Sequence, residues 1–362
     1  MKKLTVLGIE TSCDDTSVCV IHGEYGNSSE RPEVLAHDSF SQETLLRKWG
    51  GVVPEIAARN HLAKIAPLIE QVLEKADVTL ADIDLLGVTT HPGLLGPLLT
   101  GLNAAKTLSL KHEIPILPVN HLYAHLEAIH ITEEISYPYL GLIVSGGHSL
   151  YLLVSSPTEF KILGSTIDDA AGEAFDKGGK LMGLGYPAGR EIDDRGKLGD
   201  FNKYEFPIGL RQSGDANLSY SGVKTSLRQF LERNPGITED EDSPESEQKM
   251  NDLCASYQHA IVGQLKLKMR YAIAQVEEKG FKDLQIVVGG GVACNSYLRK
   301  VLTETYKNVS FVLPRYCTDN GAMIANYALR TFEENQIPFP ECLGIDAKGR
   351  YLKKSELQTK GQ

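Results

Sequence analysis

Two segments of the chain share one pattern of apolar and polar positions. Residues 4–9 form an apolar run that meets a polar turn at 10–16 and continues as a second apolar run at 17–21. Residues 140–154 repeat this plan around a Ser-Gly-Gly-His-Ser turn. Short apolar runs joined by a tight polar turn are typical of β-hairpins. Aligned over fifteen residues each, 7–21 and 140–154 share three identities, so the pattern predicts two hairpins related by duplication.

Helical periodicity and further apolar runs occupy the rest of the chain. Apolar residues at helical spacing predict helices at 54–75, 100–110, from 120 onward, 253–278, 296–305 and 322–332. Shorter apolar runs predict strands at 83–89, 114–119, 284–288 and 311–313. This alternation of strands and helices is typical of an α/β fold.

The length of 362 residues predicts two lobes, because a single hydrophobic core rarely grows beyond roughly 250–300 residues. We expect lobe I to comprise 1–118 and 320–345, and lobe II to comprise 119–319. Within lobe II, the acidic stretch 234–248 contains Pro and Gly and is expected to be a solvated loop. The polar residues 346–362 are expected to form a flexible tail.

The composition narrows the function classes. A formal net charge of −10 disfavours a free-standing nucleic-acid binder, although a faint excess of Lys and Arg at 176–228 favours a local nucleic-acid face. No apolar run approaches the ~20 residues that span a bilayer. Glu10 ends the N-terminal apolar run after six residues, too early for a signal peptide. Six scattered cysteines without a Cys-x-x-Cys pair indicate a reducing, cytoplasmic setting.

Two histidines form a candidate metal site. His121 and His125 are four residues apart, which places both imidazoles on one helical face and suits two ligands of one ion. Two core histidines bonded to the backbone explain the same pattern, and both interpretations stay open. A zinc peptidase would carry Glu directly after the first histidine, and Leu122 stands there.

Asp319 is the candidate third ligand. It lies in Cys-Thr-Asp-Asn-Gly-Ala at 317–322, where a strand is expected to end and a helix to begin. Two His and one Asp leave coordination positions open on Zn²⁺ or Fe²⁺. The alternative is a helix cap, since Thr, Asp and Asn are the residues that bond to free amides at a helix start.

Small and polar residues follow three predicted strands, at 12–15, 145–148 and 289–295. Glycines let the backbone approach a ligand closely, and amides at a helix start favour an anion. Each turn alone is ordinary, and none has the Gly-x-Gly-x-x-Gly spacing. Together they predict phosphate or nucleotide binding. The acidic segments 168–177 and 186–193 are interpreted by default as solvated surface.

Six motifs stand in a fixed order. They are Gly-Ile-Glu-Thr-Ser-Cys-Asp-Asp-Thr at 8–16, Asn-His-x-x-x-His at 120–125, Val-Ser-Gly-Gly-His at 144–148, Glu-Ala-Phe-Asp-Lys at 173–177, Gly-Gly-Gly-Val at 289–292 and Cys-Thr-Asp-Asn-Gly-Ala-Met-Ile-Ala at 317–325. In this order and spacing, the chain resembles the tRNA adenosine threonylcarbamoyltransferase family, called TsaD in bacteria and once described as sialoglycoprotein endopeptidases. The resemblance covers about residues 4–330 and is far more specific than any single motif.

The resemblance implies an α/β fold of the actin/hexokinase/Hsp70-like (ASKHA) type, with two duplicated lobes and a ligand cleft between them. It implies that His121, His125 and Asp319 bind a metal ion, with Fe²⁺ favoured over Zn²⁺. It also implies a set of substrate-binding residues, namely Ile143, Val144, Ser145, Gly146, Gly147, Asp176, Gly189, Asp193 and Asn295.

The implied reaction transfers the threonylcarbamoyl group from threonylcarbamoyl-AMP to the exocyclic amine of the adenosine 3′ of the anticodon, in tRNAs reading codons that begin with A. The chain would therefore be an acyltransferase. Implied partners are an inactive TsaB-like paralogue and a small TsaE-like ATPase, which would help to build a tRNA surface. Asp15 stands where many members carry Glu and is a candidate catalytic residue. Ile143 stands where archaeal relatives carry Tyr.

Other function classes stay open at this point. A small-molecule kinase of the same fold usually carries an Asp-x-Gly-Gly-Thr-like turn in its second hairpin, and the turn at 145–148 has no Asp. A metallopeptidase is disfavoured by Leu122. A non-catalytic scaffold would bind no metal.

Overall fold

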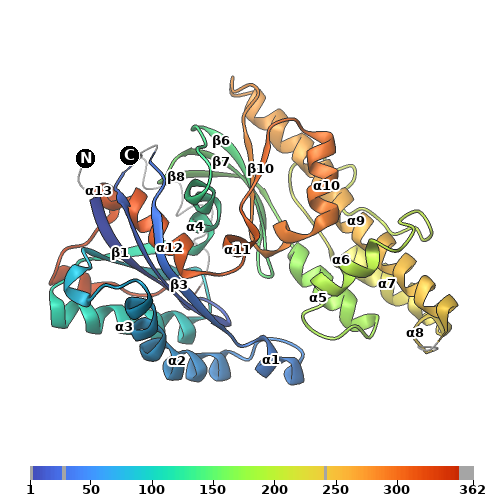
Figure 1. Ribbon diagram of the computed structural model, residues 1–362. Coiled ribbons are helices and arrows are strands. Elements are labelled where there is room, and N and C mark those ends of the chain that lie inside the picture. The colour runs from blue at the N-terminus through green and yellow to red at the C-terminus, as the bar shows by residue number, and fades with distance from the viewer. Residues whose placement is uncertain (1–2, 27–29, 240–242, 350–362) are drawn as a thin grey trace. The chain divides into compact units, whose positions relative to one another are not determined.

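The computed structural model describes residues 3–26, 30–239 and 243–349 (Figure 1). The chain divides into two compact units. The first unit comprises Met1–Glu134 and Asp319–Gln362, and the second comprises Ile135–Thr318. Each unit contains one five-stranded mixed sheet with helices packed on it, as expected for a two-lobed α/β protein.

The two sheets have the same topology. The first consists of β1 (Lys3–Glu10), β2 (Asp15–Glu24), β3 (Glu33–Ser41), β4 (Leu85–His91) and β5 (Ile116–Asn120), in the order β3-β2-β1-β4-β5. The second consists of β6 (Tyr139–Val144), β7 (Ser149–Ser156), β8 (Glu159–Ser165), β9 (Ile286–Gly289) and β10 (Val309–Phe311), in the order β8-β7-β6-β9-β10. In both sheets the first three strands pair antiparallel and the last two join in parallel. The predicted hairpins and their duplication are therefore confirmed.

Helices pack on both sheets, and in the second unit several helices pack mainly on one another. The first unit contains α1 (Glu43–Leu46), α2 (Pro54–Lys75), α3 (Leu95–His112), α4 (His121–Glu127), α12 (Gly321–Arg330) and α13 (Phe332–Asn335). The second contains α5 (Ala171–Leu181), α6 (Gly189–Gly196), α7 (Ser221–Arg233), α8 (Gly236–Glu239), α9 (Pro244–Glu277), α10 (Ser296–Thr305) and α11 (Pro314–Cys317). Among these described helices, none is both long enough and apolar enough to cross a membrane.

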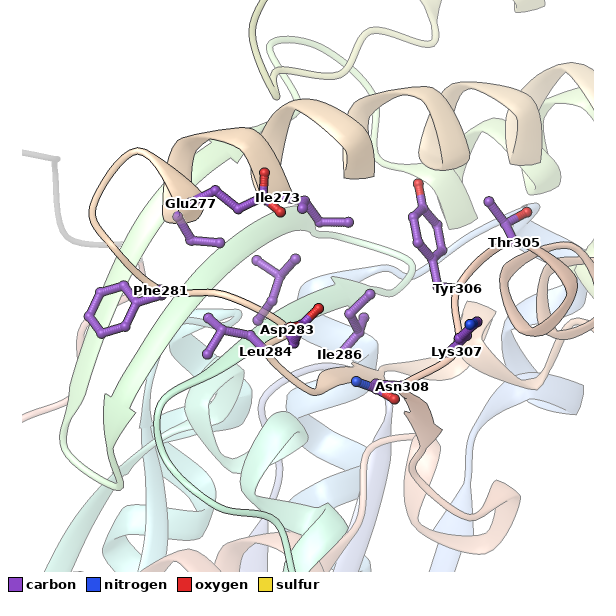
Figure 2. A pocket seen from close by; sticks show the side chains of 12 residues that line it. Ile273, Glu277, Phe281, Asp283, Leu284, Ile286, Thr305, Tyr306, Lys307 and Asn308 are labelled. Carbon is purple, nitrogen blue, oxygen red and sulfur yellow. The ribbon is translucent and has the colours of Figure 1, made fainter.

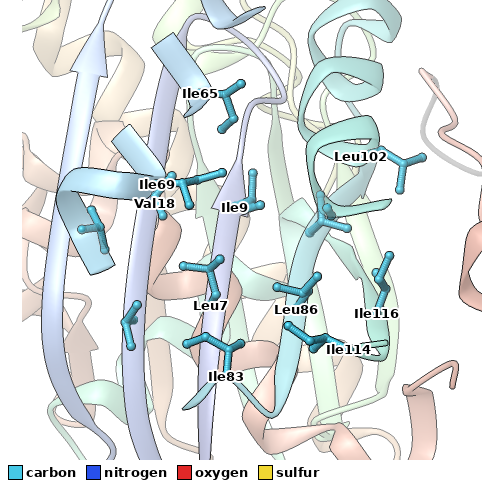
Figure 3. Packing of buried hydrophobic residues seen from close by; sticks show 14 of the residues in the cluster. Leu7, Ile9, Val18, Ile65, Ile69, Ile83, Leu86, Leu102, Ile114 and Ile116 are labelled. Atoms are coloured by element: carbon cyan, nitrogen blue, oxygen red, sulfur yellow. The ribbon is translucent and has the colours of Figure 1, made fainter. Parts of the chain in front are cut away.

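One face of the first sheet forms a large hydrophobic core with α2 and α3. Leu7 and Ile9 are two residues apart on β1, so both side chains point to this face, and both are fully buried. Ile69 from α2 and Leu102 from α3 belong to the same buried cluster (Figure 3). Burial of each such side chain contributes roughly 1.5–3 kcal/mol, so this layer stabilises the sheet that supports the candidate ligands.

The opposite face of the first sheet is built for close approach of α12 (Figure 1). A Cβ at Gly8 would lie 2.6 Å from the amide nitrogen of Ala325, and one at Gly87 would lie 2.8 Å from the Cβ of Ala328. On the helix, a Cβ at Gly321 would lie 2.7 Å from the amide nitrogen of Cys19. Glycine at these positions lets backbone meet backbone, and this contact sets the position of the start of α12.

A buried polar network ties α4 to α12. The carboxylate of Glu127 accepts a 3.0 Å hydrogen bond from Arg330, and its backbone carbonyl accepts one of 2.8 Å from Asn326. Segment 119–134 thus belongs to the first unit, whereas the sequence placed it in lobe II. The pairing crosses about 200 residues of chain and has no local signature.

Two further expectations need correction. The acidic stretch 234–248 is largely helical where described, because α8 lies in it and α9 already begins at Pro244. Ser243 caps α9. Glu245 and Glu247 lie in its first turn, where their negative charges interact favourably with the helix dipole. The expected tail also begins later than residue 346, since Lys348 donates a backbone hydrogen bond to Thr90. Residues 350–362 lie outside the described part of the chain.

Most other element boundaries agree with the pattern to within a few residues, whereas α9 begins nine residues before the predicted start at 253. Helices α2 and α10 have the predicted limits. Helix α3 begins at Leu95, five residues before the predicted start at 100, and β10 begins two residues before the strand predicted at 311–313. Ends of this kind depend on capping and pairing partners more than on the apolar repeat.

Substitution Gly8→Ala is expected to destabilise the first unit by about 1–3 kcal/mol, because the new methyl group overlaps α12. Gly222→Ala is the matched control, since a Cβ there meets nothing within 4 Å. Urea unfolding of both variants measures the difference. Equal stability of Gly8→Ala and the unsubstituted protein would contradict the close packing of α12.

Candidate functional site

Three side chains of the first unit converge on one point. The Nε2 atoms of His121 and His125 are 3.1 Å apart. Oδ1 of Asp319 lies 3.4 Å from the His121 Nε2 and 3.2 Å from the His125 Nε2. The two histidine side chains are buried, and that of Asp319 is 22% exposed. The structure thus brings together the three residues that the sequence proposed as metal ligands.

The local sequence explains the placement of the histidines. Asn120 ends β5, and its side chain caps α4 by accepting hydrogen bonds from the backbone amides of Leu122 and Tyr123. His121 is therefore the first residue of α4, and His125 follows one turn later on the same face. The residue after His121 is Leu122, which is fully buried. The glutamate that a zinc peptidase carries at this place therefore has no counterpart here.

The capping alternative for Asp319 is wrong. The cap of α12 is Asn320, whose side chain accepts a 2.9 Å hydrogen bond from the amide of Met323. The amide of Gly321 donates to Ser17 Oγ at 2.8 Å, which fixes the start of α12 against β2. Asp319, directly before the cap, directs its carboxylate to the two histidines.

The three ligand atoms fit one metal ion. Ligands about 2.1 Å from a common ion lie roughly 3.0–3.4 Å apart at angles between octahedral and tetrahedral values. The observed separations of 3.1, 3.2 and 3.4 Å fall in this range. Two imidazole nitrogens and one carboxylate oxygen form a donor set used for Fe²⁺ and Zn²⁺. In the described part of the chain, this is the group of three His, Cys, Asp or Glu side chains close enough to hold an ion.

A fourth buried residue contacts this site, and sequence reasoning did not assign it a role. Glu10 ends β1, is fully buried, and has Oε2 3.1 Å from the His121 Nδ1. The Thr89 hydroxyl donates to the same carboxylate oxygen at 2.5 Å, and the amide of Ser12 donates to the other oxygen. A carboxylate that ends an otherwise apolar strand was the available signal, because such a group needs buried partners.

The charges in this cluster influence one another. Burial disfavours the imidazolium form of His121, but the carboxylates of Asp319 and Glu10 outweigh it and raise the pKa of His121 to about 9. Burial and the neighbouring His121 charge lower the pKa of His125. Burial also opposes ionisation of Glu10, yet the charge of His121 and its hydrogen bond hold the pKa of Glu10 below its ordinary value. The acidic groups therefore favour a cation at this place.

Asp15, the candidate catalytic residue, begins β2 in the same electrostatic environment. Burial, followed by the carboxylates of Asp14 and Asp319, raises the pKa of Asp15 to about 7. Its Oδ1 is buried and has no hydrogen-bond partner in the described structure. A carboxyl group with a pKa near neutrality is suited to proton transfer.

In the second unit, the turn after β6 lies against two other glycine-containing segments. The Ser145 carbonyl accepts a hydrogen bond from the amide of Gly172 at 3.1 Å, beside the start of α5. A Cβ at Gly290 would lie 2.8 Å from the carbonyl carbon of Val144. Ile143 and Val144 are themselves buried strand residues of β6. The predicted turns at 145–148 and 289–295 therefore meet at the carboxyl ends of β6 and β9.

The other four candidate residues of this unit lie in α6 or in segments near it. The Asp176 carboxylate accepts a 2.9 Å hydrogen bond from the amide of Ala188, next to Gly189. Asp193 accepts from the amide and hydroxyl of Ser296 at 3.0 and 2.9 Å, and Asn295 caps α10. These contacts give Asp193 and Asn295 a structural role at the start of α10.

The faint basic excess at 176–228 is partly neutralised. Lys177 and Lys224 each contact Asp169, at 2.7 and 2.5 Å, and Lys197 contacts Asp194 at 2.7 Å. These ion pairs reduce the positive charge that the stretch offers to a phosphate backbone.

A cavity of about 280 Å³ lies at the opposite ends of the same strands (Figure 2). Its wall includes Ile286 at the start of β9, together with Phe281, Tyr306 and Lys307. None of the candidate substrate residues lines it. The cavity is therefore separate from the motifs singled out in the sequence.

Comparison with known proteins identifies the family. Residues 33–326 match the family TsaD, tRNA N6-adenosine threonylcarbamoyltransferase. A protein of that name from Rickettsia rickettsii (strain Sheila Smith) is 40% identical over 354 residues, which cover 96% of this chain and 98% of the relative. Its counterpart from Thermosipho africanus is 41% identical over 91% of this chain and 95% of the relative. The chain belongs to this family, so the predicted resemblance and the assignment as an acyltransferase are confirmed.

Solved structures with low sequence identity share the fold. Component A of Acidaminococcus fermentans (R)-2-hydroxyglutaryl-CoA dehydratase is similar with a TM-score of 0.50 and 16% identity, covering 91% of this chain and all of that one. The activator of the Clostridium difficile 2-hydroxyisocaproyl-CoA dehydratase is similar with a TM-score of 0.51 and 13% identity, covering 91% of this chain and 96% of that one. These similarities support the predicted fold type, the two-lobed actin/hexokinase/Hsp70-like class.

Adding Zn²⁺ to metal-free protein is expected to raise the unfolding temperature of the first unit. At a free metal concentration of 100 times Kd, binding stabilises the folded state by about 2.7 kcal/mol, or roughly 5–10 °C. His121→Ala should abolish this shift, whereas His112→Ala, at the end of α3, should retain it. Differential scanning calorimetry with and without Zn²⁺ measures both. An equal shift in all three proteins would mean that the ion binds elsewhere.

Proposed function

We propose that this protein transfers the threonylcarbamoyl group of threonylcarbamoyl-AMP to the exocyclic amine of the adenosine 3′ of the anticodon, in tRNAs reading codons that begin with A. The amine nitrogen forms a bond to the carbamoyl carbon, the bond from that carbon to the phosphate oxygen breaks, AMP leaves, and the amine loses one proton. The observation that carries the proposal is the convergence of His121, His125 and Asp319 in a member of this family.

We assign His121, His125 and Asp319 as the ligands of one metal ion, and the donor set favours Fe²⁺ over Zn²⁺. A bound ion of this kind supplies Lewis acidity that orients and polarises the carbonyl of the transferred group. The chain itself contributes a rigid frame, because His121 and His125 stand on one helix face and Asp319 precedes a helix clamped to β2. Asp15, with its raised pKa, is the candidate for accepting the amine proton.

Glycines of the second unit support a nucleotide site. Gly146 and Gly147 have ordinary φ values, and a Cβ on either would meet nothing within 4 Å. A Cβ on Gly189 would meet only Phe175, at 3.9 Å. Neither backbone strain nor packing within the chain requires glycine at these three positions. Close approach of an external group, here threonylcarbamoyl-AMP, is a sufficient reason.

The location of these residues in the sheet supports the same site. The turn at 145–147 follows β6, and Asn295 lies shortly after β9. Ligands of open α/β sheets bind beyond the carboxyl ends of the strands. We assign adenylate contacts to Asp176, Gly189, Asp193 and Asn295, and contacts with the threonylcarbamoyl group to the β6 end, 143–147.

The acidic chain needs help to hold tRNA. With a net charge of −10, it would repel a polyanion unless another component contributes basic surface. We therefore place it in a complex with a TsaB-like paralogue and a TsaE-like ATPase, as the catalytic subunit.

Reconstitution is the direct test. The protein, the two partners, unmodified tRNA and threonylcarbamoyl-AMP are combined, and modified adenosine is measured by mass spectrometry with and without chelator. We expect modification that chelator abolishes and that added Fe²⁺ or Zn²⁺ restores. His121→Ala and Asp319→Ala should each lower the rate by at least 100-fold, on the order of one lost catalytic interaction.

His112 is half-buried at the end of α3 and does not belong to the ligand set. His112→Ala therefore serves as the control and should modify tRNA at the normal rate. Unchanged rates in both ligand variants would overturn the metal assignment. Absence of modification in a mixture where the Rickettsia or Thermosipho relative is active would overturn the proposed reaction.

Gly189→Ala separates nucleotide binding from folding. Because its Cβ has space in the free chain, the unfolding temperature should stay within about 2 °C, as for a neutral surface change. Affinity for AMP should fall by 10-fold or more, since the methyl group would occupy the approach of the adenylate. Isothermal titration calorimetry with AMP measures this, with Gly222→Ala as control. Unchanged AMP affinity would remove Gly189 from the site.

A further inference from the structure

We propose that Glu10 is the positioning residue of the metal centre: it accepts the hydrogen on Nδ1 of His121 and so directs Nε2 of that imidazole to the ion. The inference rests on the proposed metal site and adds a residue to it that is not itself a ligand. Its basis is the set of contacts around one buried carboxylate.

Each oxygen of Glu10 is held by a donor from a different segment. Oε2 accepts from the Thr89 hydroxyl on β4 at 2.5 Å and lies 3.1 Å from the His121 Nδ1 on α4. Oε1 accepts from the backbone amide of Ser12 at 2.5 Å. Glu10 is fully buried at the end of β1, so its carboxylate has one fixed orientation.

This arrangement determines which nitrogen of His121 can bind a metal. An ionised carboxylate is only an acceptor, so the Nδ1 facing it must carry hydrogen. In the neutral ring that binds a metal, the lone pair is then on Nε2, and this atom is the one that lies 3.1 Å from the His125 Nε2 and 3.4 Å from Asp319 Oδ1. Carboxylate–histidine–metal arrangements of this kind fix the ring and increase the basicity of the ligand.

The two histidines differ in this respect. Nδ1 of His125 is buried and has no hydrogen-bond partner in the described structure. His121 is therefore the ligand oriented from behind by an acidic group. Any effect of Glu10 on the ion should consequently pass through His121 and should vanish when that histidine is absent.

Ser12 is the competing partner. Its hydroxyl lies 3.2 Å from the same Nδ1, and a hydroxyl can donate as well as accept. If Ser12 donated to Nδ1, that nitrogen would carry the lone pair and Nε2 would carry the hydrogen. The proposal requires the opposite tautomer, so Ser12 and Glu10 variants distinguish the two arrangements.

Cobalt binding provides a readout that does not depend on catalysis. Metal-free protein is titrated with Co²⁺, affinity is measured by competition with a chromophoric chelator, and the visible absorption of the bound ion reports its coordination. Glu10→Gln keeps the size of the side chain and removes the carboxylate. We expect 10–100-fold weaker Co²⁺ binding and a changed absorption spectrum.

Matched variants complete the experiment. Asp252→Asn makes the same carboxylate-to-amide change at a buried residue of α9, where Asp252 accepts from the Asp200 amide, and should bind Co²⁺ normally. Ser12→Ala should also keep the affinity and spectrum. If Glu10→Gln fails to fold, Thr89→Val replaces it, because loss of that hydroxyl frees the carboxylate, and weaker Co²⁺ binding is again expected.

The outcomes separate this inference from the metal site itself. Normal Co²⁺ affinity and spectrum in Glu10→Gln, together with loss of binding in His121→Ala, would overturn the role of Glu10 and leave the metal site standing. A loss in Ser12→Ala instead of Glu10→Gln would assign the role to Ser12. Normal binding in His121→Ala would overturn both. In a double-variant cycle, Glu10→Gln should cause no further loss once His121 is replaced.

Discussion

The contact between α12 and the first sheet is the constraint on which the candidate site depends. At Gly8 and Gly87 the sheet face has no side chain, and at Gly321 the helix has none. Backbone can then meet backbone, and the start of α12 lies directly against β2. Asp319 directly precedes that start, so the packing of α12 on the sheet decides where the third candidate ligand lies. Close-packed interiors transmit such displacements because they contain little free volume.

Electrostatics within the first unit follow from that geometry. Glu10 and Asp319 lie beside two buried imidazoles, and carboxylates removed from water need compensating partners. In the free chain the imidazolium of His121 supplies positive charge, as its raised pKa indicates. A divalent ion held by the same side chains would supply it instead. Local stability and metal affinity are thus two consequences of one arrangement of charges.

The duplicated sheets have acquired different chemistry. Both contain an antiparallel hairpin joined to a parallel pair of strands, in the same order. In the first unit, Glu10 at the end of β1 lies beside His121, and Asp14 and Asp15 follow it in the chain. In the second, the hairpin turn carries Gly146 and Gly147, with open space where side chains would stand. A shared scaffold with different loops is the usual way in which one fold acquires distinct sites.

Features that depend on local repeats could be predicted from the amino-acid pattern alone. The hairpins, the limits of α2 and the shared face of His121 and His125 are of this kind. They follow from side-chain periods of two residues in strands and 3.6 residues in helices, which can be recognised within a short segment. Features that depend on long-range contacts became visible only in the folded chain. Glu127 pairs with Arg330 and assigns 119–134 to the first unit, and Asn320 caps α12, which leaves the Asp319 carboxylate to the histidines. Glu10 acquired its partners only when β1, β4 and α4 came together. Such contacts join residues about 80–200 positions apart, and no local pattern encodes them, because their energy arises only after the chain has packed.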